Sequence, residues 1–291
     1  MKETSKNLLI TKSQRSVYWV DSYANGLSFG QTKVDSNKDV RDLFPLELGE
    51  RAEVANLRSR YPLNKKNPLH ELELNLMRLS RQGELSSALI CLGVMSDPFL
   101  PFEGKFHASQ KFLQLFTKYK PGLLMVQTRS PLIVLAVPVL QKLGKYVSVT
   151  IAIETHDQKM ADRYAPELPA IEDRIRAANS LRRLGIEVNI QVSPLLPYGD
   201  WRKDAPGFAD FLAVHSDYVH VMPLSGRASA GSKTCAVAEA ARKLAFDRKF
   251  HWLRSDAANP LLTELEKIAP QKLVMPQRET LREKQLDIFA A

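Results

Sequence analysis

The feature that most constrains the fold is a series of six short apolar or β-branched segments separated by stretches with helical periodicity. The segments are residues 16–20, 86–94, 123–128, 146–153, 185–193 and 217–222. Most are nearly continuous apolar runs, which is typical of parallel strands buried on both faces of a sheet. Their alternation with helices predicts a parallel α/β fold.

Two of the intervening stretches carry clear helical patterns. Residues 169–184 have apolar side chains at helical spacing between Pro169 and Gly185, which are typical start and stop residues. Residues 68–82 carry a similar leucine stripe, which indicates packing against the core.

Six strands with intervening helices fit either an incomplete barrel or a doubly wound sheet. The pattern alone leaves both open, and either fold would occupy residues 1–268. Residues 40–85 are expected to form a mostly helical insertion. Residues 269–291 are rich in proline, glutamine and charge, which indicates an extended C-terminal tail.

Composition limits the classes of partner. The chain has 291 residues, of which 44% are hydrophobic, so it can bury a sizeable core. A formal charge of +9 favours DNA or another anionic partner, although a merely basic soluble protein has the same charge. Two cysteines, Cys91 and Cys235, exclude a disulfide framework. No run of 18 apolar residues occurs, so we expect a cytoplasmic protein without a membrane partner.

The ends of the predicted strands carry polar residues. Both candidate folds bind ligands at the carboxyl ends of their strands, so these residues are expected to meet at one mouth. For each residue a helix cap or a turn is an equally good explanation, as at Asp97-Pro98 or Ser130-Pro131. The candidate cofactor-binding residues are Ser96, Asp97, Glu103, Arg129, Glu154 and Ser193.

Residues 90–200 resemble the radical S-adenosylmethionine (SAM) proteins related to spore photoproduct lyase, a group often labelled DNA repair photolyase. An Asp-Pro-Tyr-Gln-Pro-x-Glu loop of that family is similar to residues 97–103 here, and a Thr-Lys-Ser to residues 128–130. A Thr-x-Asp at a strand end and a Pro-x-x-Pro strand end are similar to residues 155–157 and 194–197. The resemblance implies a radical SAM-type barrel, that is, a partial TIM-like (β/α)6 barrel of parallel strands with outer helices over residues 1–268.

The family's chemistry depends on three cysteines in a Cys-x3-Cys-x2-Cys loop after the first strand, which hold a [4Fe-4S] cluster. The corresponding stretch here is residues 21–33, where the resemblance places Gly26, Gly30 and Lys33 at the ligand positions. None of these residues supplies a thiolate. We therefore expect no [4Fe-4S] cluster, no metal site and no catalytic residue of the family's type. If the chain is nevertheless an active enzyme, the resemblance implies a spore photoproduct lyase-like lyase.

SAM is kept as a candidate ligand. The resemblance places Arg129 where the family has a lysine that meets the SAM carboxylate, and arginine can pair with a carboxylate in the same way. Glu154, however, takes the place of a small or hydroxylated residue, and its charge would repel that carboxylate. Either the pocket is vestigial and the fold is a binding scaffold, or the pocket serves another ligand.

The C-terminal tail carries a second motif. Its last residues include the pentapeptide Gln285-Leu286-Asp287-Ile288-Phe289, which resembles the peptide that bacterial polymerases and repair factors insert into the sliding clamp. The apolar side chains would fill a pocket of the clamp while Gln285 forms hydrogen bonds at its rim. The alternative is an amphipathic end that packs on its own barrel.

These observations lead to three hypotheses. The first is a cluster-lacking, DNA-associated accessory or repair-linked protein that is tethered to the bacterial sliding clamp. The second is an enzyme of the radical SAM type that binds SAM or another anion, with an atypical or partner-supplied cluster. The third is a substrate-binding protein unrelated to DNA.

Overall fold

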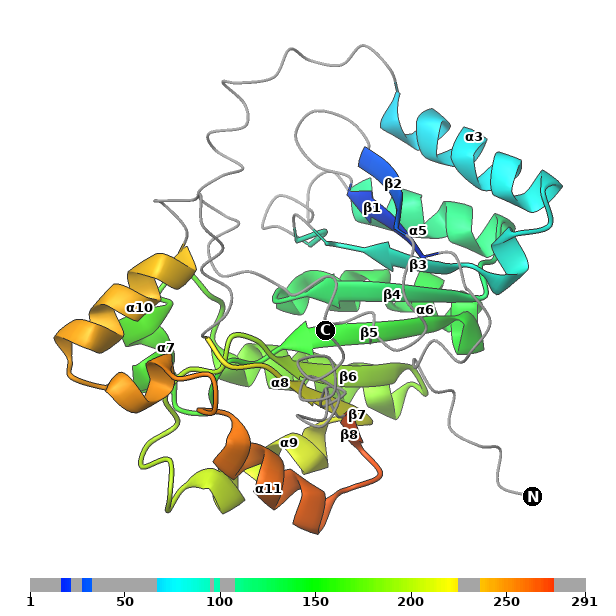
Figure 1. Cartoon of the computed structure of the whole chain (residues 1–291). Helices are drawn as coiled ribbons and strands as arrows, with labels where there is room; N and C mark the ends of the chain where they lie inside the picture. The colour runs from blue at the N-terminus through cyan, green and yellow to red at the C-terminus, as the bar shows by residue number, and fades with distance from the viewer. Residues whose placement is uncertain are drawn as a thin grey trace, which may run out of the picture.

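The computed structural model describes residues 17–21, 28–32, 67–94, 97–99, 108–224 and 236–274. These segments form one open sheet with flanking helices (Figure 1). The strands are β1 (Val17–Asp21), β2 (Ser28–Thr32), β3 (Leu89–Leu92), β4 (Leu123–Thr128), β5 (Val147–Ala152), β6 (Glu187–Val192), β7 (Tyr218–Val221) and β8 (Leu273–Val274). The α-helices are α3 (Pro68–Arg81), α5 (Ala108–Lys118), α6 (Val137–Leu143), α7 (Gln158–Tyr164), α8 (Ile171–Arg183), α9 (Ala205–His215), α10 (Ala236–Phe246) and α11 (Asn259–Ile268).

Short 3₁₀ turns join several of these elements. They are η1 (Leu85–Ser87), η2 (Pro131–Ala136), η3 (Gly144–Tyr146) and η4 (Phe250–Leu253). Along the described part of the chain no helix is long and apolar enough to cross a membrane.

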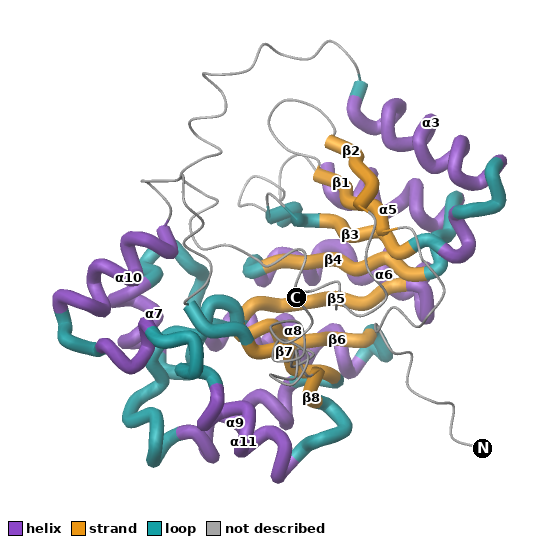
Figure 2. The backbone as a smooth tube through the Cα atoms, viewed as in Figure 1, coloured by secondary structure: helices purple, strands orange, loops and turns teal. Residues whose placement is uncertain are grey.

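The sheet has the strand order β2-β1-β3-β4-β5-β6-β7-β8, and every pair except β1–β2 is parallel. From β3 onward each strand lies next to its predecessor in the chain, without the reversal of order that defines a doubly wound sheet. Figure 2 shows the strands stacked in this order from β2 to β8. The sequence left two architectures open, and the strand order selects the partial barrel.

All six predicted strands are present, and two strands escaped prediction. β2 is polar and contains a glycine, so its sequence carries no apolar run, and β8 has only two residues. The two helical predictions are confirmed as α8 and α3. In α3 the side chain of Asn67 accepts a hydrogen bond from the Leu69 amide (3.1 Å), which caps the helix.

The two faces of the sheet differ in chemistry. Alternate residues of β5 and β6, such as Val149 and Ile190, join the large apolar cluster that also contains residues of α3, α5 and α8. Because successive side chains of a strand point to opposite faces, the residues between them lie on the face turned away from this cluster. We call this second face the inner face. Near β3 it is apolar, with Cys91 and Met125, and toward β5 and β6 it becomes polar.

Candidate functional site

Asp97 joins the loop after β3 to the end of β4. Its carboxylate accepts hydrogen bonds from the Thr128 hydroxyl (2.6 Å) and from the backbone amides of Arg129 (2.8 Å) and Phe99 (2.9 Å). Asp97 is buried, so the three donors largely use the capacity of its two oxygens. The carboxylate therefore joins the loop after β3 to the end of β4, and its bond from the Phe99 amide fits the turn interpretation of Asp97-Pro98.

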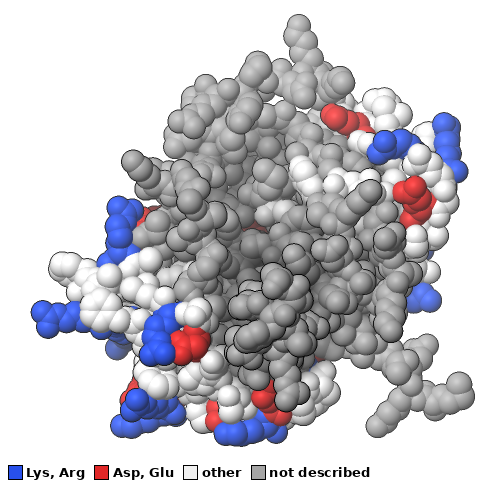
Figure 3. Space-filling view, in the orientation of Figure 1, with Lys and Arg blue, Asp and Glu red and all other residues white. Residues whose placement is uncertain are grey.

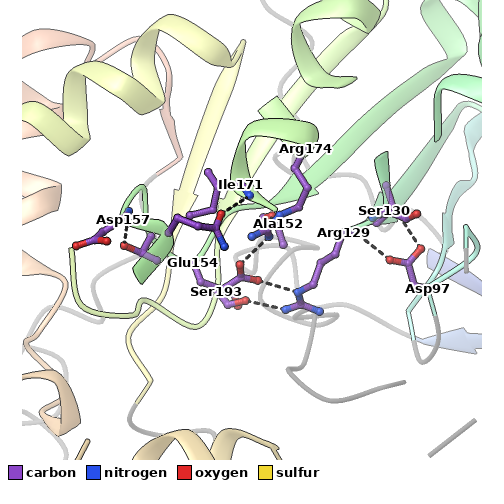
Figure 4. Close-up of polar contacts among 12 residues, drawn as sticks. Asp97, Arg129, Ser130, Ala152, Glu154, Asp157, Ile171, Arg174 and Ser193 are labelled. Carbon is purple, nitrogen blue, oxygen red and sulfur yellow. Dashed lines mark hydrogen bonds and ion pairs between the residues drawn. The ribbon is translucent and has the colours of Figure 1, made fainter. Parts of the chain in front are cut away.

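Arg129 and Glu154 form the centre of the mouth (Figure 4). The Nε atom of Arg129 donates to Oε1 of Glu154 over 2.7 Å, and its Nη2 atom donates to the Ser193 carbonyl over 3.2 Å. The two side chains are 7% and 1% exposed, so water screens this ion pair little. The structure thus brings together four predicted site residues: Asp97, Arg129, Glu154 and Ser193.

A second buried arginine completes the network. Arg174 of α8 donates from Nη1 to Oε2 of Glu154 (2.8 Å) and to the Ala152 carbonyl (2.6 Å), and its side chain is 0% exposed. Each oxygen of Glu154 consequently contacts one guanidinium. Arg174 is not among the predicted site residues, although the sequence carries a signal for it. It lies between Ile171 and Ile175 on the buried stripe of α8, where a charge requires a partner.

The electrostatics of Glu154 follow from this geometry. Burial alone would raise the pKa of the Glu154 carboxyl, but the attraction of Arg174 and Arg129 and their hydrogen bonds outweigh it, and the pKa is lowered. Glu154 lies between the two guanidinium groups, whereas the Asp97 carboxylate accepts from the Thr128 hydroxyl and from backbone amides. We call Arg129, Glu154 and Arg174 the buried ion network.

The loop after β5 is held by contacts within the protein. The Thr155 hydroxyl donates to the Pro197 carbonyl (2.8 Å), and the carboxylate of Asp157 caps α7 through the Lys159 amide (2.9 Å). Between them His156 stacks on Phe208 with ring centroids 4.8 Å apart, and burial lowers the pKa of its imidazole. The contacts of these three residues order the loop.

Some predicted residues lie outside the described residues: Gly26 and Lys33 of the cluster loop, Ser96 and Glu103 of the loop after β3, and the pentapeptide Gln285, Leu286, Asp287, Ile288 and Phe289. Residues 40–66 of the expected helical insertion and 275–291 of the expected tail lie outside them as well. Their roles remain predictions.

One of the three positions that the resemblance assigns to cluster ligands lies within the described residues. Gly30 lies within β2, opposite Trp19 of β1, so this position belongs to an antiparallel hairpin and carries no donor side chain. Cys91 lies buried in β3. Where the chain is described, no group of three His, Cys, Asp or Glu side chains could hold a metal ion.

Comparison with known sequences finds one distant relative. No family model matches the chain. A curated relative, the uncharacterized protein ORF301 of Acidianus two-tailed virus, is 26% identical over 118 residues, which are 40% of this chain and 38% of that protein.

Solved structures of spore photoproduct lyase superpose on the chain. A variant of that enzyme gives a TM-score of 0.53 at 11% identity, over 71% of this chain and 66% of the enzyme. Spore photoproduct lyase complexed with dinucleoside spore photoproduct gives 0.52 at 12% identity over the same shares. At such low identity the likeness concerns the fold. The chain therefore has a radical SAM-like α/β fold, a partial barrel of parallel strands in an open sheet with flanking helices.

Proposed function

We propose that the protein is a DNA-associated accessory protein that uses a radical SAM-like scaffold without radical chemistry. The observation that carries the proposal is the Arg129–Glu154 ion pair. By resemblance Arg129 is the residue that would meet the carboxylate of SAM, and Glu154 already supplies a carboxylate to it at 2.7 Å. Because Arg174 binds the other oxygen of Glu154, a SAM carboxylate could reach Arg129 only by displacing a carboxylate that is held from both sides.

A second candidate is an enzyme that binds SAM or another small anion. The radical SAM-like fold favours it, and it requires Glu154 to release Arg129 when the ligand arrives. Anaerobic reconstitution with iron and sulfide, followed by a visible spectrum and a SAM titration, separates the two. The scaffold proposal expects no cluster absorbance and no SAM binding. Cluster absorbance together with bound SAM would overturn it in favour of the enzyme.

The DNA-associated part of the proposal is supported by a surface on α10 and the segment after it. Phe246 and Phe250 are 83% and 60% exposed, and exposed Arg242 and Arg248 lie beside them in the sequence. Figure 3 shows Lys and Arg side chains over this part of the molecule, with some acidic ones between them. Exposed rings next to arginines suit stacked bases and phosphates of single-stranded DNA. Trp252, by contrast, is buried and belongs to the core.

Fluorescence anisotropy with a labelled single-stranded oligonucleotide tests this surface. We expect binding that weakens with salt and that falls about tenfold or more in Phe246→Ser/Phe250→Ser, because stacking contributes about 1–3 kcal/mol per base. Val214→Ser is the matched control, since Val214 is an apolar side chain of α9 with 64% exposure. Equal affinity of the double variant and the control would remove this surface from the proposal.

We also propose that residues 285–289 tether the protein to the bacterial sliding clamp. The support is the sequence of this pentapeptide on a tail of polar composition. A pulldown of purified clamp with the wild-type chain and with Leu286→Ala/Phe289→Ala tests the proposal. Recovery should depend on both side chains, and equal recovery by the variant would eliminate the tether.

A further inference from the structure

The turn that ends α10 has an unusual backbone conformation. The Arg248 amide donates to the Ala245 carbonyl (3.1 Å), and the Lys249 amide donates to the Leu244 carbonyl (2.9 Å). This pair of bonds defines the Schellman motif of a helix end, in which one residue adopts a left-handed conformation. That residue is Arg248, with a φ of 56°. Among the residues that the structure describes, it is the only one other than glycine with a positive φ.

Two other helices of the protein end in the same motif, and both use glycine. The left-handed residue is Gly83 after α3 and Gly185 after α8, with φ values of 73° and 76°. The same two amide-to-carbonyl bonds recur there: Gly83 to Ser80 and Glu84 to Leu79, and Gly185 to Arg182 and Ile186 to Leu181. Glycine is favoured because a Cβ atom crowds the backbone in this conformation. The fold alone would therefore favour glycine at position 248 as well.

The contacts of Arg248 do not explain why an arginine stands there. Its side chain is exposed, and within the described part of the chain no hydrogen bond or ion pair engages its guanidinium. The acidic neighbour Asp247 already has partners, because Arg163 of α7 donates to both of its oxygens (3.1 and 2.8 Å) and the Tyr164 hydroxyl donates to it (2.9 Å). A disfavoured backbone conformation that no internal contact repays points to a role in binding.

The surroundings of Arg248 indicate what it binds. Phe246 and Phe250, two residues before and after it, are 83% and 60% exposed. The bonds between Asp247 and α7 fix this turn to the neighbouring helix, which lies beside α10 (Figure 1). A guanidinium pairs with a phosphate through two parallel N–H donors, and exposed rings stack on bases. A cation between two exposed rings therefore suits a nucleic acid strand, in which phosphates alternate with bases.

We propose that Arg248 binds a backbone phosphate of single-stranded DNA at the surface that carries Phe246 and Phe250. Arginine occupies the left-handed position for this contact, although glycine would make the fold more stable. The inference rests on the DNA association proposed above and adds the residue that meets the phosphate. One substitution, Arg248→Gly, should consequently strengthen the fold and weaken the binding.

Three full-length variants separate these two effects. Arg248→Gly removes both the charge and the disfavoured backbone conformation, whereas Arg248→Lys keeps both. Arg183→Ala is the matched control, because Arg183 is an exposed arginine in the last turn of α8, which ends in the same motif. Each protein is titrated with a labelled single-stranded oligonucleotide by fluorescence anisotropy at several salt concentrations. The melting temperature of each is measured without DNA.

Arg248→Gly should melt about 2 °C or more above the wild type, because glycine relieves the left-handed position. Its affinity should fall about fivefold at about 0.1 M salt, and the slope of log affinity against log salt should become shallower by about 0.7, the value for one phosphate contact on a single strand. Arg248→Lys and Arg183→Ala should both keep the slope of the wild type.

The outcomes distinguish this inference from the function on which it rests. If the wild type does not bind the oligonucleotide, the proposed DNA association fails, and the role of Arg248 fails with it. If the wild type binds and Phe246→Ser/Phe250→Ser binds less, but Arg248→Gly keeps the wild-type slope, the role of Arg248 is overturned while the DNA surface stands. A melting temperature of Arg248→Gly at or below that of the wild type would overturn the argument that binding, rather than the fold, accounts for the arginine.

Discussion

Replacement of Glu154 by glutamine tests whether this carboxylate stabilises the fold through its ion pairs with Arg129 and Arg174. Glutamine has nearly the same shape, so packing is retained, but the change removes the carboxylate that contacts Arg129 at 2.7 Å and Arg174 at 2.8 Å. Both guanidinium groups stay buried, with exposures of 7% and 0%. Removing one partner of a buried pair costs about 3–5 kcal/mol, because an uncompensated charge remains in the interior. We expect the free energy of unfolding to fall by about that amount at neutral pH.

Urea unfolding followed by circular dichroism measures this loss. Glu73→Gln is the matched control, because Glu73 forms an ion pair of the same length with Lys118 (2.7 Å) that is largely exposed. The control should unfold close to the wild type, since exposed pairs contribute little. If the free energy of unfolding of Glu154→Gln differs from that of the wild type as little as that of Glu73→Gln does, the two arginines do not hold Glu154 in the folded protein.

The pH dependence supplies an independent check on the same network. The pKa of Glu154 is lowered below its ordinary value of 4.5, so the folded state favours the charged carboxylate. Its contribution to stability is therefore complete above pH 4.5 and is lost as the pH falls through the lower, folded-state pKa. The difference between wild type and Glu154→Gln should be constant near neutral pH and should shrink below pH 4.5. A difference that persists unchanged in acid would contradict this assignment.

Three further predictions follow from other described residues. Gly93→Ala should destabilise the fold more than Gly83→Ala: both glycines have positive φ (89° and 73°), but an added Cβ at position 93 would lie 2.5 Å from the Gln127 carbonyl, whereas position 83 is open, and denaturant unfolding compares them. Burial lowers the pKa of His156 below 6.5, so its NMR titration should lie below that value in the folded protein, and its contribution to stability should fall as the pH drops below 6.5; an ordinary titration would refute its burial against Phe208. Burial and the hydrogen bond to Asp247 raise the pKa of Tyr164 to about 12, so ultraviolet titration should show one tyrosine that ionises near this value and disappears in Tyr164→Phe.

Local pattern was a good guide to the elements themselves. The segment at 123–128 is a strand over the predicted residues, and the helix predicted at 169–184 is α8. Such elements are specified by side chains close in sequence, whose periodicity reflects which face is buried. The strand β2 was not predicted, because it is held by its pairing with β1 and its five mostly polar residues show no strand pattern of their own.

The polar side chains on the inner face of the sheet also follow a pattern in the sequence. In β5 and β6, Ser148, Thr150, Asn189 and Gln191 alternate with valine and isoleucine, a period-two pattern that indicates faces of different chemistry. Their average hydrophobicity instead predicts nearly continuous apolar runs, which are typical of parallel sheets covered on both faces. The alternation, rather than the average hydrophobicity, carried the information.

The sequence by itself determined the order of the strands and helices, the carboxyl-end position of Asp97, Arg129, Glu154 and Ser193, and the lack of a three-cysteine motif. Only the tertiary structure decided what these residues do. Glu154 meets Arg129 and Arg174, which are 25 and 20 residues away, because β4, β5 and α8 pack side by side. A pairing between distant residues depends on strand order and helix docking, which no local pattern encodes. The same packing joins Arg129 and Glu154, both predicted to bind a ligand, to Arg174 in a buried ion network.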